Sequence, residues 1–434
     1  MRLRRAAVGA SLAGLTALVF AGLSRPDAPP LAIPSAPAKE PGSLLGIVGD
    51  GAPRAKLARV GPASLRPMPG RRVAVGTGAT SWDFSPDASF LVLARHVENR
   101  TSVSASLQFV DVRRMRALGR VRLGSGDIRG LVWLDADRLL AVRANCCTSG
   151  ATVFVVDAAR RRVLDTRSLD GQLLRVGAAA EGLVLLTAPD ELGAARLVFL
   201  DGAGAPRSIT LDRIAAGYDY PDGPEGPDEV VRAIEPGLAV DADAGTAYVV
   251  PAAGDLAAVE LASGAVSYRT LRAPSSRLQR FLSWLEPTAQ AKVLEGSSRF
   301  ATYLGNDLIA LTGVNYIRGE RRTVVEPAGL AVVEAGSGVS RKLDDQATSV
   351  VQADGLLLAP GPDGLAAYGS DGGRRFAVLP GKAVYVAEAV GGRAYVGVEP
   401  QSGRRFLKMI DLASGRVLGE RRAELPKLLL TTPR

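Results

Sequence analysis

The chain has 434 residues with 49 glycines and 27 prolines, is 47% hydrophobic and 22% charged, and carries a formal net charge of +9. This length suits two or three average domains or one large single-core architecture, and the apolar fraction excludes a disordered chain. A single histidine, His96, excludes the HExxH metalloprotease motif and any metal site built from several histidines.

The N-terminus predicts export. Residues 1–5 (MRLRR) carry three arginines, and residues 6–23 carry no charge. A basic start followed by an apolar run and small residues is typical of a secretory signal peptide, here residues 1–21. An uncleaved membrane anchor that extends to residue 23 is the alternative. Both place the protein outside the cytoplasm, as a secreted, periplasmic or outward-facing anchored protein.

A proline-rich stretch and a pair of adjacent cysteines are two further features of the sequence. Residues 24–43 contain six prolines, which predicts an extended Pro/Ala-rich linker outside the core. The only cysteines, Cys146 and Cys147, are adjacent and cannot join distant segments. In an oxidising compartment they form a vicinal disulfide or bridge to another chain, and otherwise they are a pair of free thiols.

A repeated hairpin pattern organises the rest of the chain. It reads LQFVDVRRMRALGRVRL at 107–123, VFVVDAARRRVLDTRSL at 153–169 and LKMIDLASGRVLGE at 407–420. A second kind of hairpin alternates with it, as in GLAVDADAGTAYVVPA at 237–252. The alternation yields four-stranded antiparallel units about 35–50 residues long, a period that predicts an all-β chain folded as one β-propeller.

The number of units and the closure of the ring follow from the same pattern. Seven units fit between residues 76 and 420. Strands within 44–75 and a C-terminal strand at 428–432 supply a shared closing unit, so the propeller spans 44–434. This favours eight blades, with seven as the alternative. Apolar residues spaced i, i+3, i+4 and i+7 from Leu278 predict a short helical insertion near 276–290.

Two motifs carry a resemblance to known proteins. WDFSPDASFLVLA (82–94) is similar to a W-x-x-S-P-D-G-x-x-L motif, with Ala88 in place of the glycine, and DLASGRVLG (411–419) is similar to a D-x-x-T-G-x-V turn. The chain thus resembles bacterial exported β-propellers of the TolB and YVTN kinds, which are relatives of WD-repeat proteins. The resemblance implies the fold and no particular activity.

The lengths of the connections distinguish the two ends of such a ring. If the strands of a unit are lettered a to d from the axis outward, the d–a and b–c connections share one end and the a–b and c–d turns share the other. We call these ends the long-loop face and the short-turn face. The long connections all belong to the first: 95–106, 144–151, 212–233, 272–298, 313–327 and 399–405. Long loops on a rigid scaffold indicate a binding face.

Two of these loops carry candidate binding residues. Four carboxylates recur every third residue and a fifth follows them: Asp219, Asp222, Glu225, Asp228 and Glu229. They suit a basic partner or a calcium ion, or form a solvated loop. The other loop carries Arg318, Arg321 and Arg322, whose guanidinium groups suit carboxylate or phosphate, or are simply solvated.

The leading hypothesis is an exported, non-enzymatic propeller that binds a protein or cell-envelope ligand through the long-loop face. It needs no cofactor and acts as a monomer. It has no basic run interleaved with aromatics for nucleic acid, and meets a membrane only through an N-terminal anchor. The alternative is a calcium-dependent lactonase or esterase, a class of exported propellers whose scattered ligands no motif marks. No catalytic residue is assigned, so the question of enzymatic activity stays open.

Overall fold

The structure, a computed structural model of the chain, describes residues 31–34, 44–48, 55–75, 79–99, 102–144, 150–180, 182–201, 206–219, 232–272, 294–318, 323–398, 406–422 and 429–431. The expected helix near 276–290 and the pair Cys146 and Cys147 lie outside these ranges. Within them every regular element is a β-strand, and no helix is long and apolar enough to cross a membrane.

Six sheets have four antiparallel strands each. One joins the two ends of the propeller and consists of β34 (Leu429–Thr431), β1 (Leu44–Val48), β2 (Lys56–Arg59) and β3 (Val73–Ala74). The next two are β4 (Ala79–Phe84), β5 (Phe90–Asn99), β6 (Ser102–Asp111) and β7 (Arg116–Ser125), then β8 (Asp127–Trp133), β9 (Arg138–Ala144), β10 (Ala151–Asp157) and β11 (Arg162–Leu169). The others are β17 (Gly237–Asp241), β18 (Thr246–Val250), β19 (Asp255–Glu260) and β20 (Val266–Thr270); β26 (Val351–Ala353), β27 (Leu356–Gly361), β28 (Gly364–Tyr368) and β29 (Arg374–Val378); and β30 (Val384–Val390), β31 (Arg393–Val398), β32 (Phe406–Asp411) and β33 (Val417–Arg422).

The seventh sheet has ten strands. They are β12 (Gln172–Ala179), β13 (Gly182–Ala188), β14 (Gly193–Asp201), β15 (Arg207–Asp219), β16 (Arg232–Glu235), β21 (Leu294–Gly305), β22 (Leu308–Arg318), β23 (Thr323–Pro327), β24 (Leu330–Glu334) and β25 (Ser340–Asp344). The short strand β16 links two four-stranded groups, because it pairs antiparallel with β15 and parallel with β21. Strand β23 pairs with the end of β22 beyond the part that pairs with β24.

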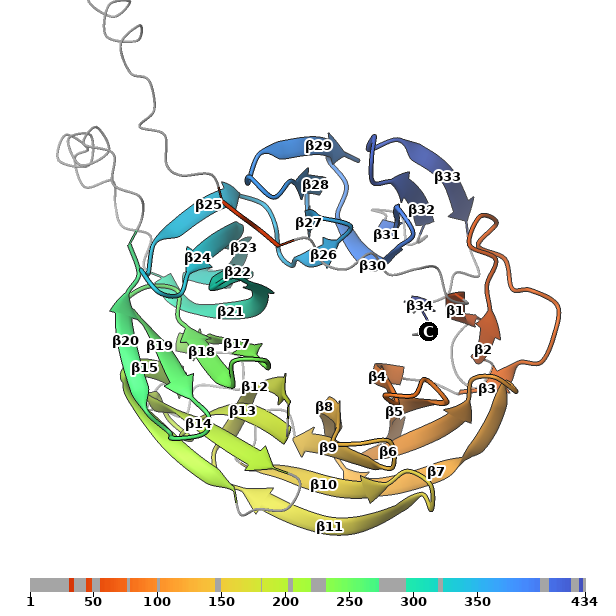
Figure 1. Cartoon of the computed structure of the whole chain (residues 1–434), viewed down its shortest axis with the longest axis horizontal. Helices are drawn as coiled ribbons and strands as arrows, with labels where there is room; N and C mark the ends of the chain where they lie inside the picture. Colours follow the sequence, from red (N-terminus) through yellow and green to blue (C-terminus); the bar gives the residue numbers. More distant parts are fainter. Residues whose placement is uncertain are drawn as a thin grey trace, which may run out of the picture.

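The sheets follow one another around a ring, with β4, β8, β12, β17, β21, β26 and β30 nearest the axis (Figure 1). The predicted all-β propeller of four-stranded antiparallel units is therefore confirmed. The prediction of eight blades is not supported. Hydrogen bonding yields six separate four-stranded sheets, because β16 fuses the remaining strands into the ten-stranded sheet. The predicted helical insertion has no counterpart among the described residues.

The outer hairpins close on a local turn that the sequence motif encodes. In the β10–β11 turn, Asp157 Oδ1 accepts a hydrogen bond of 2.7 Å from the backbone N–H of Arg160. In the β32–β33 turn, Asp411 Oδ1 accepts one of 2.8 Å from Ser414, and Gly415 follows with a φ of 71°. An aspartate that bonds to its own turn, followed by a residue with positive φ, explains why the D-x-x pattern recurs.

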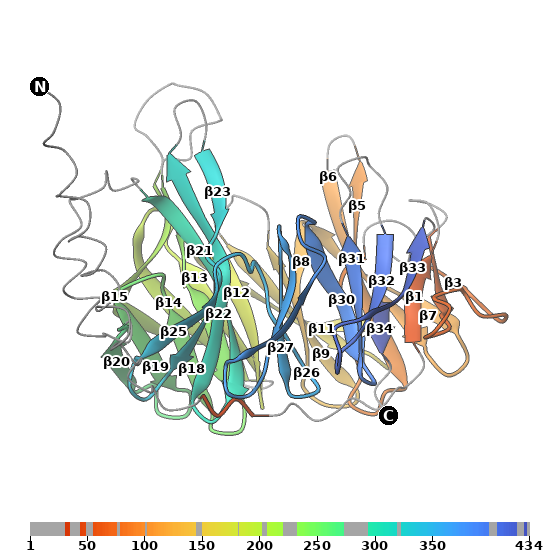
Figure 2. The same cartoon turned by 90° about the horizontal axis from the view of Figure 1, so that it is seen from above.

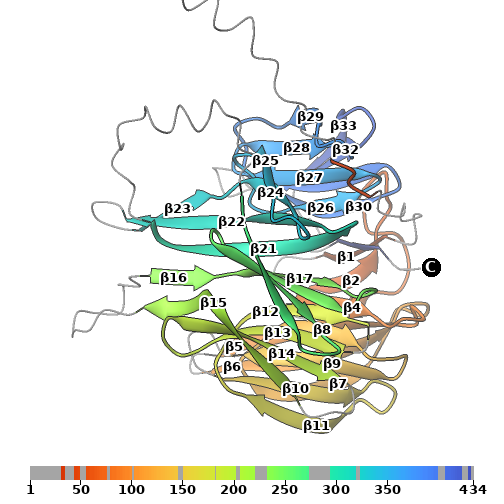
Figure 3. The same cartoon turned by 60° about the vertical axis from the view of Figure 1, so that its left-hand side comes forward.

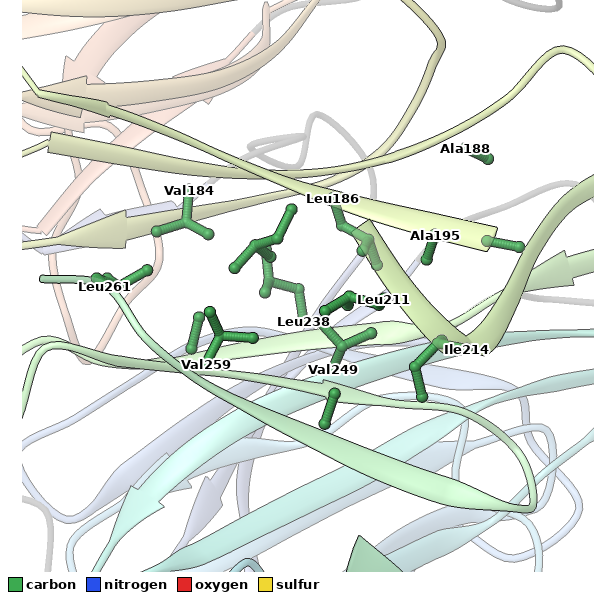
Figure 4. Close-up of a cluster of buried hydrophobic side chains, with 14 residues drawn as sticks. Val184, Leu186, Ala188, Ala195, Leu211, Ile214, Leu238, Val249, Val259 and Leu261 are labelled. Carbon is green, nitrogen blue, oxygen red and sulfur yellow. The ribbon is translucent and has the colours of Figure 1, made fainter. Parts of the chain in front are cut away.

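Aliphatic side chains fill the space between neighbouring sheets. Between the β12–β15 group and the β17–β20 sheet, Leu186 and Leu211 pack with Leu238, Val249 and Val259 (Figure 4). Such clusters arise because every second residue of a strand points to the same face of its sheet. Each fully buried aliphatic side chain stabilises the fold by about 1.5–3 kcal/mol, so these interfaces hold the ring together.

Residues 31–34 correct one expectation about the Pro/Ala-rich stretch. Leu31 and Ile33 are buried, with 7% and 4% of their surfaces exposed, among core residues of β21–β25 and of the β26–β29 sheet. The Ile33 N–H donates to the Ser370 carbonyl (2.9 Å), and the Gln352 amide donates to the Pro34 carbonyl (2.7 Å). Part of the predicted linker is thus core, because its apolar side chains alternate and fill a gap between two sheets.

The two ends of the ring are built differently. The β5–β6 hairpin and the β22–β23 extension rise at one end, while residues 31–34 lie at the other (Figure 2). Ser370, the partner of Ile33, belongs to the β28–β29 turn, which places the docked segment on the short-turn face. The risen hairpins belong to the long-loop face.

Candidate functional site

Asp219 and Arg318, the described residues that precede the rest of the predicted acidic and basic sets, both end strands of the ten-stranded sheet. Asp219 ends β15 and is exposed, and Arg318 ends β22. Strands β15, β16, β21 and β22 are consecutive neighbours. At about 4.8 Å between adjacent strands, the ends of β15 and β22 lie about 14 Å apart. The other predicted binding residues lie outside the described residues: Asp222, Glu225, Asp228, Glu229, Arg321 and Arg322.

This part of the sheet extends beyond the ring, and we call it the raised sheet. It comprises β16, β23 and residues 217–219 of β15, 294–300 of β21 and 313–318 of β22, which all extend in one direction (Figure 3). Parallel pairing of β16 with β21 depends on Gly296, because a Cβ there would come within 2.0 Å of the Ala233 carbonyl oxygen. A glycine at 296 therefore permits the approach that joins the two groups of strands.

A network of polar side chains lies on one face of the raised sheet. Arg175 of β12 donates from Nη2 to Glu235 Oε2 (2.9 Å) and to Ser298 Oγ (2.7 Å), and from Nε to the Arg299 carbonyl (2.9 Å). Ser298 donates to Glu235 Oε2 (2.8 Å), and the Tyr218 hydroxyl donates to Glu235 Oε1. The network therefore ties β12, β15, β16 and β21 together.

Burial and ion pairing compete at Glu235. Its side chain is 16% exposed and that of Arg175 is 14% exposed. Burial by itself raises the pKa of Glu235, but Arg175, Tyr218 and Ser298 together hold this pKa below its usual value. Burial and the bond to Glu235 raise the pKa of Tyr218 well above its usual value. At neutral pH the pair is thus an ionised carboxylate and a protonated phenol, and neither is poised to exchange a proton.

Arg299 is a second buried cation in the raised sheet. Its surface is 7% exposed, and it donates to the Val314 carbonyl (2.6 Å), to the Ser298 carbonyl (3.2 Å) and to the Asn315 side-chain oxygen. Burial lowers the pKa of Arg299 to about 10. Carbonyl and amide oxygens accept the hydrogen bonds of this guanidinium. Arg299 therefore links β21 to β22, and its charge is not available to a ligand.

Apolar side chains surround the polar network on the same face. Phe300 is 51% exposed, and the Arg175 guanidinium lies 4.4 Å from its ring centre. Val325 on β23 is 58% exposed. The register places Val325 beside Tyr316, in the same row as Gly296 and Ala233. The result is a face with an ionic centre and an apolar margin.

A groove of about 390 Å³ adjoins this face. The raised sheet contributes Val314, Val325 and Pro327 to its lining, and β30 contributes Val384 and Tyr385. Since β12 and β30 are both innermost strands, and both meet this face, the face is turned toward the axis of the ring (Figure 1). A ligand bound there would sit at the mouth of the ring on the long-loop face.

No sequence motif marks most of the residues of this face. Arg175, Glu235 and Ser298 come from three separate strands, and no sequence motif marks any of them. Val324 and Val325 were part of the predicted long loop 313–327, although the run TVVEP has the β-branched composition of a strand. That composition was the one usable signal for β23.

The described residues offer no candidate site for a metal ion. They contain no group of three or more histidine, cysteine, aspartate or glutamate side chains able to hold an ion. The single histidine, His96, lies in β5. The calcium-dependent alternative therefore has no candidate ligand set in this part of the chain.

Comparison with known proteins shows the fold alone. No protein-family model and no curated protein sequence matches the chain. Among solved structures, dihydro-heme d1 dehydrogenase NirN in complex with DHE is 13% identical with a TM-score of 0.58, covering 97% of this chain and 86% of that one. The chain is a β-propeller. BamB from Moraxella catarrhalis (14% identity, TM-score 0.47, 81% and 92% covered) and the β-propeller domain of the trilobed protease from Pyrococcus furiosus (11%, 0.40, 91% and 98%) are further similar structures. The propeller resemblance expected from the sequence is confirmed at the level of fold.

Proposed function

We propose that the protein is a non-enzymatic binding propeller that acts outside the cytoplasm and holds a protein or cell-envelope ligand against the raised sheet. One observation supports this above the others. The inner face of the raised sheet combines a rigid ionic centre, exposed apolar side chains and a groove of about 390 Å³ at the long-loop end of the ring. Asp219 and Arg318, which border the predicted acidic and basic segments in the sequence, end two strands of the same raised sheet.

The chemistry of the face favours binding over catalysis. Both oxygens of Glu235 accept hydrogen bonds, Oε1 from Tyr218 and Oε2 from Arg175 and Ser298. A general base needs a pKa near the working pH, whereas the pKa of Glu235 is held below its ordinary value by the groups that donate to it. The network instead holds the face in one arrangement, which reduces the ordering that binding would otherwise require.

A protein segment suits this face better than a small apolar molecule. Among the described residues, β23 pairs only with β22, so the opposite side of β23 is a strand edge. Val324 and Val325 expose 42% and 58% of their surfaces on that strand. An extended segment that pairs with such an edge places alternate side chains on the same face, where the apolar groove lies.

Substitution of Val325 by Asp tests the proposal. A charge at the margin of the groove should abolish retention of the ligand from a cell-envelope fraction by immobilised protein. Val417→Asp on β33 is the matched control, because Val417 is 44% exposed on an outer strand. Ligands retained by wild type and Val417→Asp but lost by Val325→Asp are the expected result. Equal retention by both variants would place the binding surface elsewhere.

A further inference from the structure

The short-turn face carries a feature that ligand binding at the raised sheet does not use. Its outer rim presents exposed arginines in three neighbouring sheets. Six of them form what we call the arginine band: Arg71 and Arg72, Arg113 and Arg114, and Arg160 and Arg161. They lie in the β2–β3, β6–β7 and β10–β11 connections, which antiparallel topology puts on one face.

Contacts between the sheets make the band continuous. Arg59 of β2 donates to the Arg113 carbonyl (3.4 Å), which joins the first two connections. The Arg161 side chain lies against Gly119 of β7, since a Cβ built there would be 3.0 Å from its Cδ. The six arginines therefore follow one rim across three sheets.

Most of the charge in the band is uncompensated. Asp111 pairs with Arg114 and Asp157 pairs with Arg160, each at 3.1 Å. Among the described residues no carboxylate pairs with the other four: Arg71, Arg72, Arg113 and Arg161. The aspartates of the a–b turns in this sector, such as Asp87 and Asp135, lie on the inner hairpins and thus nearer the axis. The outer rim of the short-turn face is consequently positive in these three sheets.

The chain reaches the same face from its N-terminal side. Residues 31–34 are docked there through the Ile33 and Pro34 hydrogen bonds, and the apolar run 6–23 precedes them by only seven residues. Seven residues span at most about 25 Å. In the alternative in which residues 6–23 stay as a membrane anchor, this segment and the basic rim provide the pair of signals that holds proteins at anionic membranes.

We propose that the short-turn face rests on an anionic lipid bilayer through the arginine band, so that the raised sheet is turned away from the membrane. Charge complementarity and the position of residues 31–34 favour a bilayer over nucleic acid, because the three connections offer arginine without aromatic side chains for base stacking. This inference is independent of what the raised sheet binds.

The test compares two charge-matched triple variants of the protein, purified from its exporting host with the N-terminus that the host leaves in place. The first is Arg71→Gln with Arg113→Gln and Arg161→Gln. The control is Arg196→Gln with Arg232→Gln and Arg269→Gln, three exposed arginines on β14, β16 and β20, away from the band. Each is mixed with phosphatidylglycerol–phosphatidylcholine vesicles or with phosphatidylcholine vesicles, at low and high salt, and vesicle-bound protein is separated by flotation.

Wild type and the control should bind the anionic vesicles, and high salt should weaken that binding. At about fivefold per arginine near an anionic surface, the band variant should lose about 100-fold in partition. Phenylglyoxal labelling read by mass spectrometry supplies a second readout. Anionic vesicles should protect the arginine band and leave Arg196, Arg232 and Arg269 reactive, even where the apolar N-terminal segment inserts by itself.

Three outcomes would overturn the inference. Vesicle binding that does not depend on lipid charge or salt would show that the apolar segment alone causes the binding. An equal loss of vesicle binding in both triple variants would show that net charge, and not the arginine band, causes it. Protection of the band by duplex DNA but not by vesicles would identify nucleic acid as the partner. Retention of the raised-sheet ligand by the band variant would separate any of these failures from a failure of the proposed function.

Discussion

Glu235→Gln is the most direct test of whether the polar network holds the raised sheet in place. The carboxylate accepts hydrogen bonds from Arg175, Ser298 and Tyr218, and a glutamine amide has only one oxygen to offer these three donors. The substitution also leaves the Arg175 charge without its partner. Breaking one side of a fully buried ion pair costs about 3–5 kcal/mol. Because the two side chains are 14% and 16% exposed, we expect a loss of about 2–3 kcal/mol at pH 7.

The loss should depend on pH in a defined direction. In the folded structure, Arg175, Tyr218 and Ser298 hold the pKa of Glu235 below its ordinary value. The stability that its charge contributes is therefore fully present above about pH 4.5 and disappears as the pH falls through the folded-state pKa. Below that pH wild type also carries an uncharged side chain at 235. The difference in unfolding free energy between wild type and Glu235→Gln should shrink accordingly.

Urea unfolding followed by tryptophan fluorescence at pH 7 and at pH 3.5 measures both effects. Adding Arg175→Met to Glu235→Gln provides the control, since the double variant leaves no unpaired charge and should be no less stable than Glu235→Gln alone. A difference below about 0.5 kcal/mol at pH 7, which is the effect of an ordinary surface substitution, would show that the network does not hold the raised sheet in place. A difference that stays constant with pH would show that the charge of Glu235 is not its cause.

Three further substitutions or measurements follow from the fold. Ile33→Asp should lower the unfolding free energy by about 3 kcal/mol because it buries a carboxylate, whereas Ala32→Asp at the exposed neighbouring position should change it little, as thermal melts would show. Removal of residues 427–434 deletes β34 and leaves an edge of β1 unpaired, so we expect a large drop in melting temperature or insoluble protein. Thiol titration of the unfolded, unreduced protein should find fewer than two free thiols if Cys146 and Cys147 form a vicinal disulfide, and two if they do not.

The outer hairpins could be predicted from the sequence because their signals are local. The run LAVVEAGSGVSRKL at 330–343 corresponds to β24 and β25, and DLASGRVLG contains the turn between β32 and β33. In DLASGRVLG, Asp411, Ser414 and Gly415 lie within five residues. The motif itself therefore predicts the hydrogen bond from the Ser414 N–H to Asp411 and the positive φ of Gly415. The period of two then assigns the buried face of each strand.

The raised sheet could not be predicted in the same way, because its partners are remote in sequence. Arg175 and Glu235 are separated by 60 residues, and Arg175 and Ser298 by 123. Nothing local to any of them marks a network. The error over residues 31–34 had a different origin. Leu31 and Ile33 alternate as in a strand with one buried face, but the surrounding prolines suggested a solvated linker.

The two strands that depart from the four-strand pattern, β16 and β23, are also the two that build the candidate site. A regular unit would return from β15 directly to the innermost strand of the next sheet. Here the chain first adds β16 to the side of β21, which brings Glu235 to Arg175 and Ser298 and spans the inner end of the β17–β20 sheet. Strand β23 then widens the same wall beyond β22 and carries Val325 to the groove. Because hydrogen bonds and an ion pair already fix the wall in the folded protein, a ligand meets a preformed surface and its binding free energy is not spent on ordering that surface.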